Sequence, residues 1–296
     1  MVRVSEKALA QAEEAAKFFI QNCQEFDTPR LESETYPEEA EVLADQPYID
    51  DGNTDHMLDL YVPENPKAGE IFLLIHGGAF VYGSKELDKC FGMHLAIRSG
   101  VTVANINYQL MPKVALRDQL EDIFSAITYL NKKGYSVFHT TGDSAGGYLC
   151  VLTAILINSE EARKECGITD FHLNVTCKST SPICGAPYAS PKRFAGIFFD
   201  REGSMPSYIY NLTDAVTRHG CPPIVITTGD KDMMRRFDLH FFKKIRKTNI
   251  PVKYYCADSA DDRVMHHVYA IAHPTWPEGI KTIDMTIENA KGNSHD

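Results

Sequence analysis

Residues 142–147, GDSAGG, restrict the fold of this chain more than any other stretch, because one serine is surrounded by glycine and alanine. Gly142, Ser144 and Gly146 meet the pattern G-x-S-x-G, and Gly147 adds further room. Small flanking residues are typical of a sharp strand-to-helix turn that strains its serine and exposes the hydroxyl. A plain serine–glycine turn, or a helix N-cap at Ser144, is the simpler alternative. The rest of the chain therefore has to decide between them.

Around this turn, strand-like and helix-like segments alternate along the 296 residues. Residues 56–66 alternate Leu58 and Leu60 with polar neighbours before stopping at prolines, as a half-buried strand does. Residues 70–78 form a nearly continuous apolar run that ends in glycines, which is typical of a strand buried on both faces. We expect further strands at 101–110, 135–141, 173–182, 222–230 and 251–258, and helices at 5–26, 115–134, 145–159, 237–248 and 277–290.

This alternation predicts an α/β fold, with a mostly parallel central sheet and helices on both faces. We expect residues 1–50 to be an N-terminal helical segment, with 27–56 extended or looped, and residues 51–296 to be the main α/β domain. Residues 184–220 break the rhythm and are too long for a simple connection, so we expect an insertion near the site. The N-terminal helix would either cap a substrate pocket or pack on the body of the domain.

The charge and the cysteines of the chain exclude several classes of function. The formal net charge is -10, which suits neither nucleic acid nor an anionic membrane surface. No secretion signal and no membrane insertion are expected, because no N-terminal or internal apolar run is long enough. The eight cysteines are scattered without a C-x-x-C pair, which indicates reduced thiols in a cytoplasmic protein. Without a P-loop, a dinucleotide fingerprint or an H-E-x-x-H spacing, we expect no cofactor and no metal.

Residues able to activate Ser144 follow the last two expected strands. Asp230 and Asp232 come at the end of the first of these, and His266 and His267 lie in the loop after the second. A serine hydroxyl needs a base to take its proton, and the base needs a third group to orient it. Since the carboxyl ends of parallel strands meet at one edge of a sheet, these groups are expected to converge there. The chain order Ser, Asp, His is that of α/β-hydrolases.

Six short motifs occur in order at suitable spacings: HGGAF at 76–80, NYQLMP at 107–112, LED at 120–122, GDSAGG at 142–147, GDKDMM at 229–234 and HVY at 267–269. Together they resemble the hormone-sensitive-lipase-like esterases of the α/β-hydrolase superfamily, over about residues 58–269. The resemblance favours Asp232 over Asp230 through the GDKDMM loop. It favours His267 over His266 through the HVY motif.

The resemblance implies how three of these residues would cleave an ester. Ser144 would attack the carbonyl carbon. His267 would accept the serine proton and later hand it to the departing alcohol. Asp232 would fix the tautomer of the imidazole and stabilise the imidazolium.

The resemblance also implies an oxyanion hole of backbone N–H groups, which would stabilise the charge on the carbonyl oxygen. One donor would come from Ala145, and Gly78 and Ala79 would supply the others, with Gly77 shaping the turn. Only small residues allow so close an approach of the backbone. We expect His76 to brace this loop by hydrogen bonding and to take no part in proton transfer.

The chain departs from the family in two places. Asn107 and Gln109 replace the aspartate and arginine that are usual beside the motif tyrosine, so we expect the ion pair of that corner to be absent. Asp261 and Asp262 make the histidine loop more acidic than usual, and they would raise the pKa of the nearby histidine.

The expected activity is that of a cofactor-independent serine carboxylesterase acting on small-molecule esters with short or medium acyl groups. The same residues would serve an amide-cleaving hydrolase, either arylformamidase-like or a peptidase. A hydrolase scaffold that binds a ligand without catalysis is a third alternative, and the presence of a histidine in the expected loop argues against it. The sequence leaves open whether the protein is a homo-oligomer.

Overall fold

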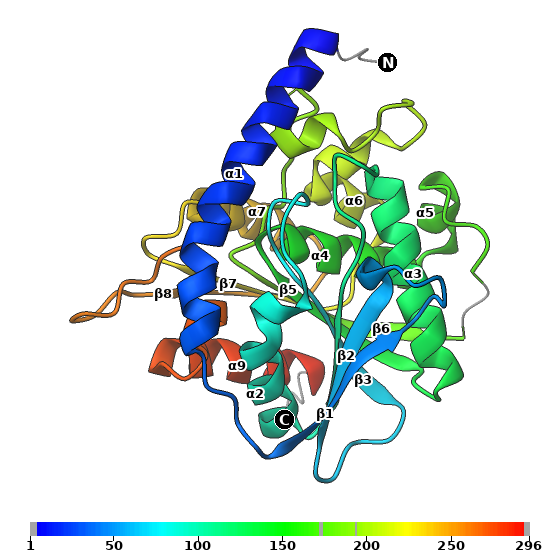
Figure 1. Cartoon of the computed structure of the whole chain (residues 1–296). Coiled ribbons are helices and arrows are strands. Elements are labelled where there is room, and N and C mark those ends of the chain that lie inside the picture. The colour runs from blue at the N-terminus through cyan, green and yellow to red at the C-terminus, as the bar shows by residue number, and fades with distance from the viewer. Residues whose placement is uncertain (1–4, 172–173, 193, 293–296) are drawn as a thin grey trace.

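The computed structural model describes residues 5–171, 174–192 and 194–292, in which eight strands form one sheet. The strands are β1 (Ala40–Pro47), β2 (Met57–Pro63), β3 (Glu70–Ile75), β4 (Thr102–Ile106), β5 (Val137–Asp143), β6 (Thr176–Ile183), β7 (Ile224–Gly229) and β8 (Val252–Ala257). Their order in the sheet is β1-β2-β4-β3-β5-β6-β7-β8. β2 is antiparallel to β1 and β4, and the other neighbouring pairs are parallel. The predicted α/β fold is confirmed (Figure 1).

Helices cover both faces of this sheet (Figure 1). They are α1 (Glu6–Ser33), α2 (Lys89–Ser99), α3 (Leu116–Lys132), α4 (Ser144–Asn158), α5 (Glu160–Glu165), α6 (Leu212–His219), α7 (Arg235–Ile245), α8 (Tyr269–Ala272) and α9 (Pro277–Ala290). One hydrophobic cluster joins α2, α8 and α9 to one face of the sheet. A larger cluster joins α3, α4, α6 and α7 to the other face.

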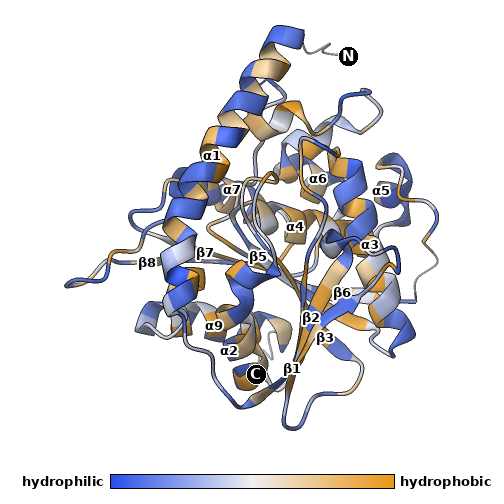
Figure 2. Ribbon diagram, in the orientation of Figure 1, coloured by the Kyte–Doolittle hydropathy of each residue, from blue (hydrophilic) through white to orange (hydrophobic). Residues whose placement is uncertain are grey.

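The strand β3 shows why both faces need helices. Its side chains alternate between the two clusters, with Leu73 in the larger one and Leu74 in the smaller one, because successive residues of a strand point to opposite faces. Both side chains are fully buried, as the apolar run at 70–78 predicts. In Figure 2 the central strands are largely hydrophobic, while α1 is mostly hydrophilic with hydrophobic residues at intervals.

The N-terminal helix is longer than its sequence indicates, since a helix was expected only to residue 26. It continues through Pro29, which lacks a backbone donor. Arg30 stabilises this last part of α1 by pairing with Asp27 at 3.2 Å and with Glu34 at 3.0 Å. Its Nη2 also donates to the carbonyl oxygen of Leu87, 3.2 Å away. The first two contacts are local pairs on the helix, and only the contact to Leu87 comes from a distant part of the chain.

The sequence did not predict several elements, among them β1 and α2. β1 is an edge strand within the 27–56 segment, and its side chains are mostly exposed, so it has no apolar alternation to detect. α2 lies between β3 and β4 and contains Gly92, where a methyl group would lie 2.7 Å from the ring of Tyr61. The 184–220 segment contains the 3-10 helices η3 (Phe194–Ile197) and η4 (Ser207–Tyr210) as well as α6.

Some sequence expectations fall outside the described residues. These are residues 1–4 of the N-terminal segment, residue 173 of the strand expected at 173–182, residue 193 of the insertion, and residues 293–296 of the main domain. Among the helices that are described, none is both long enough and apolar enough to cross a bilayer.

Candidate active site

Ser144 is the first residue of α4 and follows β5 directly. Its φ is 50°, in the left-handed region that costs a residue with a side chain roughly 1–2 kcal/mol. The neighbouring glycines make this turn possible, because it packs against the end of β3. A methyl group on Gly142 or on Gly146 would lie 2.3 Å or 1.8 Å from the carbonyl oxygen of Ile75. The small residues around Ser144 therefore serve a strained strand-to-helix turn, and the simpler serine–glycine turn is excluded.

Three side chains from separate loops form a hydrogen-bonded line. His267 Nε2 lies 2.9 Å from Ser144 Oγ, and His267 Nδ1 lies 2.7 Å from Asp232 Oδ1. Asp232 also accepts hydrogen bonds from Thr228 Oγ1 at 2.6 Å and from the backbone N–H of Met234 at 2.9 Å. Burial alone would raise the pKa of the Asp232 carboxyl, but these hydrogen bonds outweigh it and hold the pKa below its usual value. The carboxylate is thus ionised beside the imidazole.

The two alternative residues lie outside this line. Asp230 accepts hydrogen bonds from both the backbone N–H and the hydroxyl of Ser259, and its Oδ2 lies 3.6 Å from Lys231 Nζ. His266 is exposed to solvent. Asp261 and Asp262 are exposed in a turn, and no hydrogen bond to a described histidine joins them to the line. Their effect on a histidine pKa therefore stays a prediction.

The HGGAF loop follows β3 in an unusual backbone conformation. Gly78, Ala79 and Phe80 have φ values of 98°, 53° and 68°. A methyl group on Gly78 would lie 2.0 Å from the carbonyl oxygen of Tyr82. Within the described residues, the N–H groups of Gly78 and Ala79 make no hydrogen bond to the protein. Such free donors are what an oxyanion hole requires.

His76 and Gly77 fix the conformation of this loop through buried contacts. The imidazole of His76 is fully buried, stacks on the ring of Tyr108 at 4.4 Å, and has its Nδ1 2.8 Å from the carbonyl oxygen of Gly77. Burial lowers the pKa of His76 to about 4, so the ring is neutral and donates to that carbonyl. The N–H of Gly77 is directed to the carboxyl of Asp143. Both residues therefore hold the loop in shape.

A pair of buried carboxyl groups lies behind the nucleophile, and sequence reasoning missed it. Asp143 precedes Ser144, and Asp88 lies at the start of α2; both are almost fully buried. Each carboxyl group changes the pKa of the other, and neither oxygen of Asp88 has a donor among the described residues. Two buried acids so placed are expected to share one proton. Burial raises the pKa of Asp143 to about 6 and raises that of Asp88 as well. Asp143 inside GDSAGG was the only sequence signal for this pair, because its partner Asp88 lies 55 positions earlier in the chain.

Asp122 is the central acceptor of the corner beside the motif tyrosine. Asp122 accepts a hydrogen bond from the backbone N–H of Gln109 at 2.8 Å, and Gln109 Nε2 is 3.3 Å from its other oxygen. His56 Nε2 also lies 3.2 Å from Asp122, while His56 Nδ1 lies 2.8 Å from Asp51. The imidazole of His56 thus lies between the carboxylates of Asp51 and Asp122 at this corner, and the expectation about the ion pair of positions 107 and 109 stays a prediction.

The Sγ of Cys184 lies close to the acid and the histidine of the line. Ligand atoms of Cys184, Asp232 and His267 are within 4.8 Å of one another, a spacing that would allow metal ligation. Burial raises the pKa of the Cys184 thiol well above its usual value, and a neutral thiol is a poor metal ligand. The imidazole and the carboxylate are already bonded to each other. This arrangement favours proton transfer over metal binding.

The sequence is similar to those of known hydrolases. A profile of the family described as alpha/beta hydrolase fold matches residues 72–261. The carboxylesterase/phospholipase LipF of Mycobacterium tuberculosis is 32% identical over 98 residues, which are 32% of this chain and 26% of LipF. An acetyl-hydrolase of Streptomyces hygroscopicus is 22% identical over 239 residues, 73% of this chain and 74% of that protein. The match to LipF thus spans about a quarter of LipF.

The fold also resembles a solved esterase. Esterase B from Lactobacillus rhamnosis superposes with a TM-score of 0.81 at 23% identity, covering 97% of this chain and 96% of the esterase. The same esterase has been solved in a form inhibited by a tributyrin phosphonate. At this level of identity, the likeness extends to the fold of nearly the whole chain.

Proposed function

This chain belongs to the alpha/beta hydrolase fold family, and from that premise we propose that it is a serine carboxylesterase for esters with short or medium acyl groups. The observation that carries the proposal is the continuous hydrogen-bonded line from Ser144 through His267 to Asp232. The free N–H groups of the adjacent loop support it. Further support comes from the names of the similar proteins, which include a carboxylesterase, an acetyl-hydrolase and an esterase.

The proposed reaction begins when Ser144 Oγ attacks the ester carbonyl carbon and His267 Nε2 accepts the hydroxyl proton. The carbonyl oxygen becomes an oxyanion, which accepts hydrogen bonds from the N–H groups of Gly78, Ala79 and Ala145. One such donor typically contributes about 3 kcal/mol in the transition state. The intermediate collapses as His267 gives the proton to the leaving alcohol, and an acyl-serine remains.

A water molecule then repeats the sequence on the acyl-serine. His267 takes a proton from water, the hydroxide adds to the acyl carbon, and collapse returns the proton to Ser144 with release of the acid. The ionised carboxylate of Asp232 stabilises the imidazolium in both halves. Its low pKa matters here, because a protonated Asp232 would give no such stabilisation.

We also propose that α1 and the 184–220 insertion together cap the site. The ring of Phe19 in α1 contacts that of Phe194 in the insertion, with centroids 5.5 Å apart. Near its other end, Arg30 of α1 donates to the carbonyl of Leu87, which follows the oxyanion loop. These two contacts attach α1 to the insertion and to the segment after the oxyanion loop, which supports the proposed cap.

Hydrolysis of 4-nitrophenyl esters from acetate to decanoate tests the proposed function. Wild type is expected to be active, with its highest kcat/KM at a short or medium chain. Ser144→Ala and His267→Ala are expected to lose activity by at least about a thousandfold. The matched substitutions Asp230→Asn and His266→Ala are expected to change kcat/KM less than about threefold, because neither residue belongs to the line.

Two results would contradict the proposal. Full activity in Ser144→Ala would exclude this serine as the nucleophile. If wild type is inert on every ester but cleaves aryl formamides, an amide-cleaving function would replace the ester one.

A further inference from the structure

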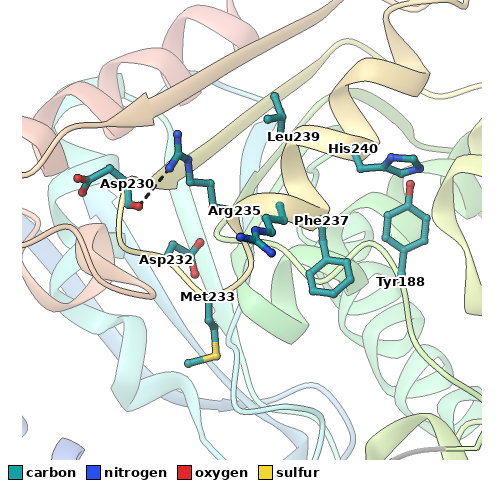
Figure 3. Close-up of a pocket in the computed structure, with 9 residues that line it drawn as sticks. Tyr188, Asp230, Asp232, Met233, Arg235, Phe237, Leu239 and His240 are labelled. Atoms are coloured by element: carbon teal, nitrogen blue, oxygen red, sulfur yellow. Dashed lines mark hydrogen bonds between the residues drawn. The ribbon is translucent and has the colours of Figure 1, made fainter.

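A groove of about 1100 Å³ opens beside the loop that carries Asp232, and apart from Asp232 its lining residues have no role in the reaction described above. We call it the acid-loop groove. Its lining includes Tyr188, Met233, Arg235, Arg236, Phe237 and His240. Figure 3 shows Tyr188 facing the side chains of Phe237 and His240, with Met233 on the loop before α7.

The acid-loop groove lies between the two segments that hold the nucleophile and the acid. On one side, the N–H of Ala186 donates to the carbonyl oxygen of Ser144 at 3.2 Å, and Tyr188 is two residues further along. On the other side, Met233 directly follows Asp232, whose carboxylate contacts the imidazole at 2.7 Å. The groove therefore adjoins the segments that carry the nucleophile and the acid, and Asp232 itself is among its lining residues.

The walls of the groove include large apolar side chains that are exposed and are not packed in the core. Met233 and Phe237 are 74% and 48% exposed, which is unusual for such large side chains. Tyr188 is held in place because its hydroxyl hydrogen-bonds Thr213 Oγ1 at 2.9 Å. Its ring lies 5.7 Å from that of His240 and 6.4 Å from that of Phe237. The groove thus offers a fixed aromatic floor to an apolar chain or ring.

The free charge in the groove is positive, although the chain as a whole is acidic. Arg236 is exposed and makes no hydrogen bond or ion pair with any residue that the structure describes. Arg235 donates only to a backbone oxygen, that of Asp230, at 3.4 Å. The carboxylate of Asp230 is occupied by Ser259 and Lys231, and the side chain of Asp232 is fully buried. An unpaired guanidinium next to apolar surface suits a carboxylate at the end of an apolar group.

We propose that the acid-loop groove is a substrate subsite, and that it selects esters whose apolar body ends in a carboxylate. Arg236 is the residue that would bind this carboxylate, while Met233, Phe237 and Tyr188 would contact the apolar body. This inference rests on the proposed esterase function, because it assigns the substrate class of the same site.

The test compares two 4-nitrophenyl esters with acyl chains of equal length, the half-ester of adipic acid and the neutral hexanoate. Arg236→Gln is expected to lower kcat/KM for the anionic half-ester about fivefold, through KM, and to leave the hexanoate unchanged. Lys243→Gln is the control, since Lys243 is an exposed cation of the same helix outside the groove. High salt is expected to shrink the difference in wild type. A second pair, 4-acetoxybenzoate against 4-acetoxybenzamide, examines the alcohol end in the same way.

The outcomes separate this inference from the function on which it rests. If wild type hydrolyses hexanoate but Arg236→Gln affects both members of each pair equally, the subsite is overturned while the esterase function stands. The same conclusion follows if Lys243→Gln reproduces the effect. If wild type hydrolyses neither the neutral nor the anionic esters, the proposed function fails and the subsite fails with it.

Discussion

At the scale of single residues, the site depends on a few positions where a side chain is either strained or forbidden. Ser144 has a left-handed φ because β5 must turn into α4 within one residue. That conformation persists because Gly146 allows the turn to rest directly on the carbonyl oxygen of Ile75. The strained backbone of Ser144 is therefore maintained by the close packing that the lack of a side chain at Gly146 allows.

Replacing Gly146 with alanine is expected to open this turn. The new methyl group would lie 1.8 Å from the carbonyl oxygen of Ile75, and backbone has to move to relieve the overlap. We expect a loss of about 1–3 kcal/mol in the free energy of unfolding, measured in urea, and at least a tenfold loss of esterase activity.

Gly52→Ala is the matched control for that substitution. Gly52 has a φ of 75°, but no described atom lies within 4 Å of an added methyl group, so only backbone strain of about 1–2 kcal/mol is expected, with full activity. If Gly146→Ala is as active as Gly52→Ala, the turn does not depend on this close contact.

At the scale of elements, α1 shows how local pairs and one distant contact stabilise the end of a helix. The side chain of Arg30 is 13% exposed and bonds Asp27, Glu34 and the carbonyl oxygen of Leu87. The last of these contacts joins the helix to the segment that follows the oxyanion loop. α1 is therefore tied to the body of the domain at its C-terminal end.

Arg30→Ala is expected to loosen the last turn of α1 and to lower the free energy of unfolding by about 1.5–3 kcal/mol, because several charged hydrogen bonds are lost. Urea unfolding measures the loss, and limited proteolysis is expected to show faster cleavage near residue 30. Arg98→Ala is the comparison: its pair with Asp284 joins side chains that are 40% and 39% exposed, so a loss below about 1 kcal/mol is expected. Equal losses of unfolding free energy in the two variants would contradict the stabilising role of Arg30 at the end of α1.

At the scale of the whole molecule, the Asp88–Asp143 pair joins the start of α2 to the strand that carries the nucleophile. Two buried carboxyl groups in contact cannot both ionise without a large cost. Burial raises the pKa of Asp143 from 3.8 to about 6, so its contribution to stability is complete below pH 4 and is lost as the pH rises through 6. A shift of this size corresponds to a loss on the order of 3 kcal/mol.

Asp88→Asn is expected to reduce this pH dependence, because the amide donates a hydrogen bond to Asp143 and removes the second acid. At pH 8 the variant is expected to be more stable than wild type, and below pH 4 the difference is expected to vanish. Urea unfolding from pH 4 to 8 measures both curves. Parallel curves would contradict the shared proton.

The sequence by itself determined the α/β fold, the strained turn at Ser144 and the order in which serine, acid and histidine follow the strands. These features are local, because the spacing of glycines and the periodicity of apolar residues each depend on residues that are close together in the sequence. The motifs already favoured Asp232 over Asp230, and the tertiary structure shows its contact with His267. Only the tertiary structure decided that Asp88 lies beside Asp143 and that an arginine-lined groove adjoins the acid loop. These contacts join residues far apart in the chain, and their distances depend on how the helices pack on the sheet.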